Sequence, residues 1–129
     1  MANYIFGLPG DDLEKMQKTL DLSIDLCTSG WNSYAAMALP GSALYKKAIE
    51  KGFELPKSYE GFSFHSYEST PLRNNSLSAK DILMFRDNAF FEYHNNKMFL
   101  SRIENKFGKL AVKNISEMLE IKLDRKLYS

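Results

Sequence analysis

Two short apolar runs in the first half of the chain each stop at a glycine- or proline-containing corner. Tyr4, Ile5 and Phe6 precede Gly7, and the small apolar residues 34–39 precede Pro40. After each corner, apolar side chains recur every three or four positions, which is the pattern of a helix packed on a sheet. The sequence therefore predicts two consecutive β/α units with parallel strands. The small apolar residues of the second strand predict that both of its faces are covered.

The first helix is expected from about Asp12 to Cys27, and the second from Ala43 to Lys51 with Gly52 as its stop. The apolar stripe of the first helix consists of Leu13, Met16, Leu20, Ile24 and Cys27. Asp11 is expected to cap this helix in a capping box with Glu14. Gly30 is expected to end the helical turn in a left-handed conformation.

Residues 53–77 contain many aromatic side chains but show no regular period. Loops of this length are uncommon in compact domains and are often functional. Two interpretations remain open for this segment: a loop held to the helices by its aromatic side chains, or a flap over a substrate cavity. His65 lies in this segment without a partner motif, and we expect it to be a surface or packing residue.

The last third of the chain predicts three helices. Ser78 and Asp81 have the spacing of a capping box, so a helix is expected from there to about His94. A shorter helix is expected from Lys97 to a stop at Gly108. The final helix should begin near Lys109, because Val112, Ile115, Leu119 and Leu123 recur at helical spacing.

Composition excludes several classes of protein. The 129 residues allow one domain at most, and 17 basic against 16 acidic residues give a net charge of +1. This balance argues against nucleic-acid binding, which usually requires a basic face. No apolar run reaches the roughly 18 residues of a membrane span. The single cysteine excludes an internal disulfide framework and agrees with a cytoplasmic location.

Common catalytic motifs are also missing from the sequence. Two histidines and one cysteine without an elbow motif do not predict a nucleophilic triad or a zinc site. Neither proline–glycine corner has the lysine of a phosphate-binding loop. Cys27 lies on a helical stripe, so we interpret it as a small buried hydrophobic residue. What remains is the backbone at the ends of two strands, where ligands of parallel sheets bind.

Several motifs resemble those of radical S-adenosylmethionine enzymes, in the order and spacing of that family. Ile5-Phe6-Gly7-Leu8-Pro9-Gly10-Asp11 resembles the fifth-strand motif, which often has Gly-Leu-Pro-Gly-Glu-Thr at its corner. Met37-Ala38-Leu39-Pro40-Gly41-Ser42-Ala43-Leu44-Tyr45 resembles the following strand and its corner. Ser78-Ala79-Lys80-Asp81 and Phe85-Arg86-Asp87-Asn88-Ala89-Phe90 are similar to the C-terminal region of the cobalamin-dependent branch. That branch includes relatives of the anaerobic magnesium-protoporphyrin monomethyl ester cyclase.

The resemblance implies a role in holding S-adenosylmethionine. In the family, the apolar residue of the fifth strand packs against the adenine and the next glycine lets the backbone pass close to the nucleoside. Those positions correspond to Ile5 and Gly7, with Phe6 between them. Backbone around Ala36, Met37 and Leu39 would contact the adenine from the other side. Asp11 and Asn3 stand where the family usually has glutamate and glycine, respectively.

The family binds a 4Fe–4S cluster through a Cys-x3-Cys-x2-Cys motif, which a chain with one cysteine lacks. We therefore expect an incomplete catalyst: the C-terminal part of a radical S-adenosylmethionine iron–sulfur oxidoreductase, excised or truncated. S-adenosylmethionine, the 4Fe–4S cluster and, in this branch, cobalamin would belong to the parent enzyme, with none bound to this chain alone. The alternative is a non-enzymatic α/β interaction or structural module.

The resulting fold expectation is an α/β chain in three parts. Residues 1–52 would form the last two β/α units of a partial TIM-type barrel, residues 53–77 an aromatic-rich connecting loop, and residues 78–129 the C-terminal helices. The first strand would pair with the remainder of the parent chain. In its absence we expect either a homodimer or a fold in which Phe85, Phe91, Phe99 and Phe107 cover the sheet.

Overall fold

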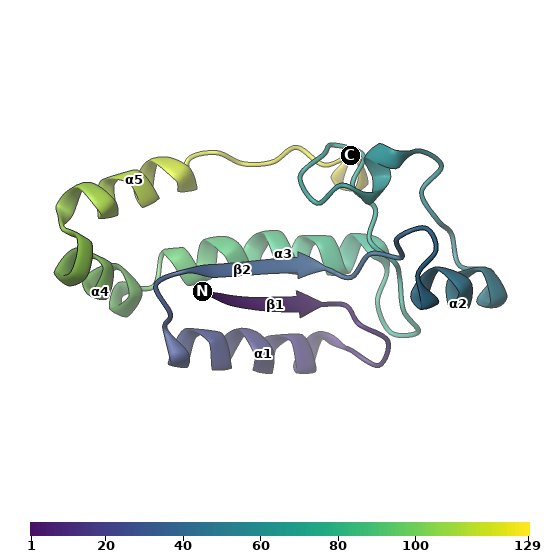
Figure 1. Cartoon of the computed structure of the whole chain (residues 1–129), viewed down its shortest axis with the longest axis horizontal. Helices are drawn as coiled ribbons and strands as arrows, with labels where there is room; N and C mark the ends of the chain where they lie inside the picture. Colours follow the sequence, from purple (N-terminus) through teal and green to yellow (C-terminus); the bar gives the residue numbers. More distant parts are fainter.

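The computed structural model describes residues 1–129, which form five α-helices, two β-strands and two short 3-10 helices (Figure 1). The helices are α1 (Leu13–Leu26), α2 (Ala43–Lys51), α3 (Ala79–His94), α4 (Lys97–Phe107) and α5 (Lys109–Leu119). The strands are β1 (Ala2–Phe6) and β2 (Trp31–Ala35), and the 3-10 helices are Tyr59–Phe62 and Lys126–Tyr128. None of the helices has the length and hydrophobicity that a membrane span requires.

Strands β1 and β2 form a two-stranded parallel sheet, which confirms the predicted α/β class and the β–α–β order. The register pairs Ala2 with Trp31 and continues to Phe6 and Ala35. Strand β2 ends at Ala35, whereas the predicted apolar run continues to residue 39. The reason is that the carbonyl of Ala36 accepts a hydrogen bond from Leu72 N at 2.9 Å, so the chain leaves the sheet direction there.

One face of the sheet is covered by α1 and α3. Successive strand side chains point to opposite faces, and the buried set on this face contains Phe6, Trp31 and Ala35. Met16 and Leu20 of α1 and Ile82, Leu83, Ala89 and Tyr93 of α3 complete this core. Ile5 on the opposite face is 48% exposed. On β2 itself, Tyr34 of that face is half-buried against Phe64 and not against a helix. The prediction that both faces of the second strand are covered therefore holds only in part, because α2 does not lie on the second face.

Helix α2 packs beyond the carboxyl end of β2 rather than on the sheet (Figure 1). It forms a small separate core in which Ala48 contacts Ala38 and Leu72. Its predicted bounds, and Gly52 as its stop, are confirmed. The second β/α unit thus lacks a helix of its own on the sheet, and the 16-residue α3 occupies that place.

The first helix differs from the prediction at both ends. Asp12, not Asp11, caps α1, and its side chain accepts a hydrogen bond from Lys15 N at 2.8 Å. The left-handed residue after the helix is Cys27, with φ 49°, and not Gly30. Cys27 is nevertheless buried, as predicted. Leu13, expected on the buried stripe, is the first residue of α1 and is 57% exposed.

Helices α4 and α5 extend away from the sheet, and the chain then returns along α3 toward the 53–77 segment (Figure 1). Phe85 packs edge-to-face on Phe6 with ring centroids 5.0 Å apart, and Phe99 is buried. Phe107 is 56% exposed, so the expectation that it covers the sheet is wrong. Helix α5 ends at Leu119, short of the predicted Leu123, since the backbone turns there through hydrogen bonds at Glu120.

Residues 53–77 contain only one short helical turn, as the lack of a period predicts. Phe53 packs against the small core of α2, and Phe64 lies 5.0 Å from the ring of Tyr34 on the sheet's second face. Tyr59, in contrast, is 86% exposed. These contacts favour a loop held to the body by two of its aromatic side chains.

Candidate functional site

An apolar hollow lies on the second face of the sheet, at the carboxyl ends of both strands. Its volume is about 470 Å³ and all of its lining residues are hydrophobic. The lining residues are Ile5, Leu8, Tyr34, Ala35, Ala36, Met37, Leu39, Leu44 and Phe64. We call this site the strand-end hollow. Its position is the one in which parallel β/α folds bind ligands, because the loops of neighbouring strands meet there.

Four of the six residues assigned to cofactor binding from the sequence line this hollow. Ile5 contributes from β1, while Ala36, Met37 and Leu39 follow β2. Ile5 and Leu39 are each 48% exposed. The parallel register places the two strand ends side by side, which is why residues about thirty positions apart in sequence share one site.

Phe6 and Gly7 do not line the hollow. The side chain of Phe6 is fully buried on the opposite face, so it supports the site only through the core. Gly7 has φ +86°, and a Cβ atom there would lie 2.5 Å from Cγ2 of Ile82. The glycine is therefore required by the close approach of α3, which is a different reason from the expected approach of a nucleoside.

The backbone N–H groups of the first corner are occupied by the protein itself. Oδ2 of Asp11 accepts hydrogen bonds from Gly7 N at 3.0 Å and Leu8 N at 3.1 Å. This is why Asp11 does not cap α1. The N–H groups of Gly7, Leu8 and Asp11 therefore do not face a ligand in this arrangement, because each of these three has a partner within the corner.

Asn74, which the sequence analysis did not single out, fixes the same corner from a distant segment. Its side-chain nitrogen donates to the carbonyl oxygens of Leu8 at 3.0 Å and Asp11 at 3.1 Å. Its side-chain oxygen accepts from the backbone N–H groups of Ser76 and Leu77. Asn74 is 5% exposed, so these bonds are shielded from water. The two carbonyl groups that it holds in the corner are more than sixty residues away, so the sequence around Asn74 does not reveal this role.

The second corner leaves backbone groups free beside the hollow. Ala36 N donates to Phe6 O, and Ser42 N donates to Leu39 O. Met37 and Ala38, which lie between them, make no backbone hydrogen bond within the protein. Of these two residues, Met37 lines the strand-end hollow, whereas Ala38 is buried in the small core of α2. The hollow therefore combines an apolar surface with the unpaired backbone groups of Met37, and a flat heteroaromatic group requires both features.

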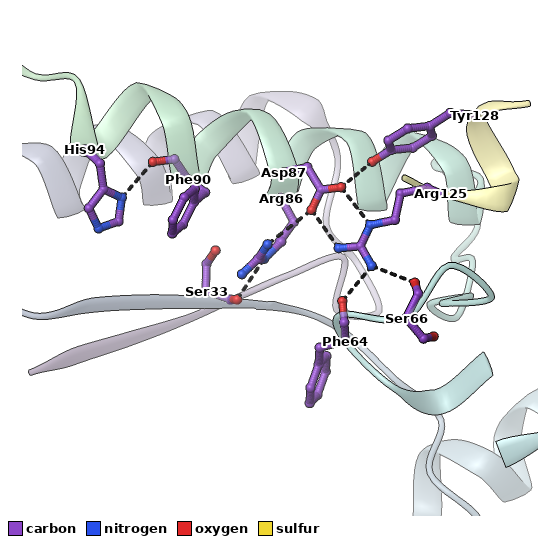
Figure 2. Close-up of polar contacts among 9 residues, drawn as sticks. All are labelled: Ser33, Phe64, Ser66, Arg86, Asp87, Phe90, His94, Arg125 and Tyr128. Atoms are coloured by element: carbon purple, nitrogen blue, oxygen red, sulfur yellow. Dashed lines mark hydrogen bonds and ion pairs between the residues drawn. The ribbon is translucent and has the colours of Figure 1, made fainter. Parts of the chain in front are cut away.

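A separate polar cluster surrounds Asp87 on α3 (Figure 2). Arg125 is fully buried and forms a bidentate pair with the Asp87 carboxylate, with two N···O distances of 3.0 Å. Burial raises the pKa of Asp87, but hydrogen bonds from Arg125 and Tyr128 outweigh it and hold that pKa below its usual value. The cluster joins the last residues of the chain to α3 and to the carbonyls of Phe64 and Ser66.

The structure does not bring together three or more His, Cys, Asp or Glu side chains in a metal-binding geometry. His65 is near the surface beside the Asp87 cluster, and Cys27 is in the core. Comparisons with models of protein families, with curated proteins and with solved structures found no match to this chain.

Proposed function

We propose that this chain is the C-terminal part of a radical S-adenosylmethionine enzyme and that its strand-end hollow forms part of the adenosine cleft. The observation that carries the proposal is the apolar hollow at the carboxyl ends of two parallel strands, with the backbone of the lining residue Met37 free of hydrogen bonds within the protein. Adenine requires a flat apolar surface and a few hydrogen bonds at its edge.

The placement of the helices on one face of the sheet supports the proposal that this chain is part of a β/α barrel. Both helices on the sheet, α1 and α3, lie on one face, while the second face carries no helix. On that second face Ile5 is 48% exposed and Tyr34 is half-buried against Phe64. In a β/α barrel the helices surround the outside and the second face of each strand points inward. We therefore assign the helix-free face to the interior of a partial TIM-type barrel, although α3 replaces the outer helix of the second unit.

The remainder of the parent chain is the partner that this arrangement requires. The sheet has two strands, so β1 and β2 each have one edge without a strand beside it. A preceding strand along β1 would extend the ladder and cover Ile5. Unpaired edges of this kind are usually covered in stable proteins.

The groups of the parent enzyme fit this chain to different degrees. The adenosine part of S-adenosylmethionine fits the apolar lining and the free backbone groups of the strand-end hollow. The 4Fe–4S cluster does not fit, because the one thiol, Cys27, lies 6% exposed in the core. Cluster ligation, and any cobalamin, therefore belong to the remainder of the parent. The chain alone has no route to cleave the cofactor.

Two observations favour the alternative, a non-enzymatic α/β module. Asp11 satisfies the N–H groups of the first corner, and Ile82 accounts for Gly7. Both features of the motif thus have a structural explanation without a ligand. The two proposals differ in whether the hollow recognises an adenine ring.

Titration of the full chain with adenosine, followed by NMR, tests this difference. We expect shifts of the Ile5 and Leu39 methyl signals and of the Met37 amide, with a dissociation constant in the millimolar range. Uridine, which has the same ribose but a smaller ring, should bind less tightly. Leu39→Asp should abolish the shifts, because a carboxylate would face the apolar lining.

The matched control is Leu22→Asp, on the exposed side of α1, where Leu22 is 55% exposed. It introduces the same charge without touching the hollow, so adenosine binding should persist. If adenosine shifts none of the lining signals, or if uridine binds equally, the adenosine assignment is wrong and the module proposal stands. The coding sequence before Met1 gives an independent test: an in-frame Cys-x3-Cys-x2-Cys motif is expected, and a stop codon in its place contradicts the proposal.

A further inference from the structure

A second hollow lies between α3 and the segment that returns from α5, and it shares no lining residue with the strand-end hollow. Its volume is about 450 Å³, within the range of small-molecule sites. Apolar side chains form one part of its wall: Phe90 and Phe91 from α3, and Met118, Ile121 and Leu123 from the returning segment. Arg86, Asp87 and Tyr128 form the polar part. We call it the α3 hollow.

The carboxylate in the wall of the α3 hollow is saturated with hydrogen bonds. Oδ1 of Asp87 accepts from Arg125 Nη2 at 3.0 Å and from Arg86 Nη1 at 3.1 Å. Oδ2 accepts from Arg125 Nε at 3.0 Å and from the hydroxyl of Tyr128 at 2.7 Å (Figure 2). A carboxylate has about four acceptor positions. Asp87 therefore has none left for a further donor.

Two guanidinium groups share this one carboxylate. The side chains of Arg86 and Arg125 are 11% and 0% exposed, and arginine stays protonated in proteins. The three charges sum to +1 in a largely buried place, where an uncompensated charge is costly. Arg125 uses its remaining nitrogen on the carbonyls of Phe64 and Ser66. Arg86 uses Nε on Ser33 O at 3.0 Å, and its Nη2 has no hydrogen-bond partner.

The other titratable groups around the hollow do not cancel this charge. Burial lowers the pKa of His65, and the charges of Arg86 and Arg125 lower it further, so His65 is neutral near pH 7. Burial and the neighbouring carboxylate raise the pKa of Tyr128, which keeps its proton. Lys122 and Asp124 are both exposed at the rim and have opposite signs.

We propose that the α3 hollow binds a small organic anion, with its carboxylate against Arg86 and its apolar body against Phe90, Phe91 and Leu123. A guanidinium with a free terminal nitrogen is suited to a carboxylate, because charge-assisted hydrogen bonds of this kind are stronger than neutral ones. The ligand is either a free organic acid or the acidic side group of a larger molecule, since both present the same chemistry. This site does not depend on the proposed barrel or on adenosine.

The experiment compares 2-naphthoate with its neutral isostere 2-naphthamide on the full chain by NMR. The naphthoate should shift the Nε–H signal of Arg86 and the amides of residues 118–124, and should leave the Ile5 signals unchanged. It should bind about tenfold more tightly than the amide, the difference expected between charged and neutral hydrogen bonds. Indole-3-acetate and indole-3-acetamide form a second pair in which a methylene separates the ring from the acidic group, and should show the same preference.

Two variants locate the site. Arg86→Gln should remove the preference for the anion while leaving weak binding of both probes. Leu123→Trp should block both probes, because the indole fills the hollow from an exposed position that does not endanger folding. Leu110→Trp, also on an exposed leucine but outside the lining, is the matched control and should bind like the parent protein.

Three results would overturn the proposal. The first is that 2-naphthoate changes none of these signals up to about 10 mM, where a millimolar complex would be mostly formed. The second is equal binding of the acid and the amide. The third is equal loss of binding in Leu123→Trp and Leu110→Trp, which would place the probe elsewhere.

Discussion

Replacing Gly7 with alanine separates two reasons for a glycine at the end of β1. The residue has φ +86°, a conformation that side chains other than glycine rarely adopt. The new Cβ would also lie 2.5 Å from Cγ2 and 2.8 Å from Cδ1 of Ile82. Ile82 is fully buried between α3 and the sheet, so it has little space to move away. The substitution therefore combines backbone strain with overpacking.

Both costs have known magnitudes. The left-handed conformation costs an ordinary residue about 1–2 kcal/mol, and overpacking a core costs about 1–3 kcal/mol. Gly10→Ala is the matched control: Gly10 has φ +89° but no atom within 4 Å of its Cβ position. Gly10→Ala should therefore show only the cost of the left-handed conformation and no cost of overpacking. We expect Gly7→Ala to reduce the free energy of unfolding by about 1–3 kcal/mol more than Gly10→Ala does, which is the overpacking cost alone.

Urea denaturation followed by far-UV circular dichroism measures these losses. A double variant isolates the contact with Ile82. Ile82→Ala by itself should cost about 2–5 kcal/mol because it leaves a cavity. In Gly7→Ala/Ile82→Ala the alanine methyl enters freed space, so the combined loss should be smaller than the sum of the single losses. Equal losses for Gly7→Ala and Gly10→Ala, or strict additivity in the double variant, would refute the packing explanation of Gly7.

Three further predictions concern the polar groups of the fold. Arg125→Met should cost about 3–5 kcal/mol in urea denaturation, because it leaves a buried carboxylate without its main partner, while the neighbouring exposed Lys126→Met should change little. Burial lowers the pKa of His94, so below about pH 6.5 the unfolded chain binds more protons than the folded one. The free energy of unfolding should therefore be greatest above about pH 6.5 and fall as the pH drops below it. His94→Gln should reduce this dependence of the free energy of unfolding on pH, measured by urea denaturation at several pH values. Asn74→Ala should cost about 1–3 kcal/mol and accelerate amide exchange in the first corner, whereas the exposed Asn75→Ala should not; unchanged exchange would contradict the role of Asn74.

Local signals in the sequence were sufficient to predict most elements. The capping box of Ser78 and Asp81 begins α3 as predicted, because both hydrogen bonds join residues three positions apart. Gly52 ends α2 as predicted, because its N–H group bonds to carbonyls only three and four positions earlier. Ile5 and Leu39, which the resemblance implies as adenine contacts, lie together at the strand ends, since parallel pairing brings the ends of successive strands together.

Long-range contacts decide what the sequence alone left open or misassigned. Asp11 and Asp12 are adjacent acids, and either one could cap α1 by local rules. Asp11 turns back to Gly7 in a corner that Asn74 also holds, which leaves Asp12 as the cap. The pair of Asp87 and Arg125 joins residues 38 positions apart, and neither one has a local motif. The open face of the sheet likewise follows from where α2 packs, which no periodicity reveals.

The Asp87–Arg125 pair also sets an order of events during synthesis. The buried residues of the main core all lie at or before Ile103, so the last of them is added 22 residues before Arg125. Until Arg125 is added, Asp87 has only Arg86 and solvent as partners, and the carbonyls of Phe64 and Ser66 lack the donor that later joins them to α3. The aromatic segment is therefore fixed last. A nascent chain interrupted before Arg125 would keep its sheet but expose a loose, aromatic-rich loop, the kind of surface that chaperones and proteases recognise.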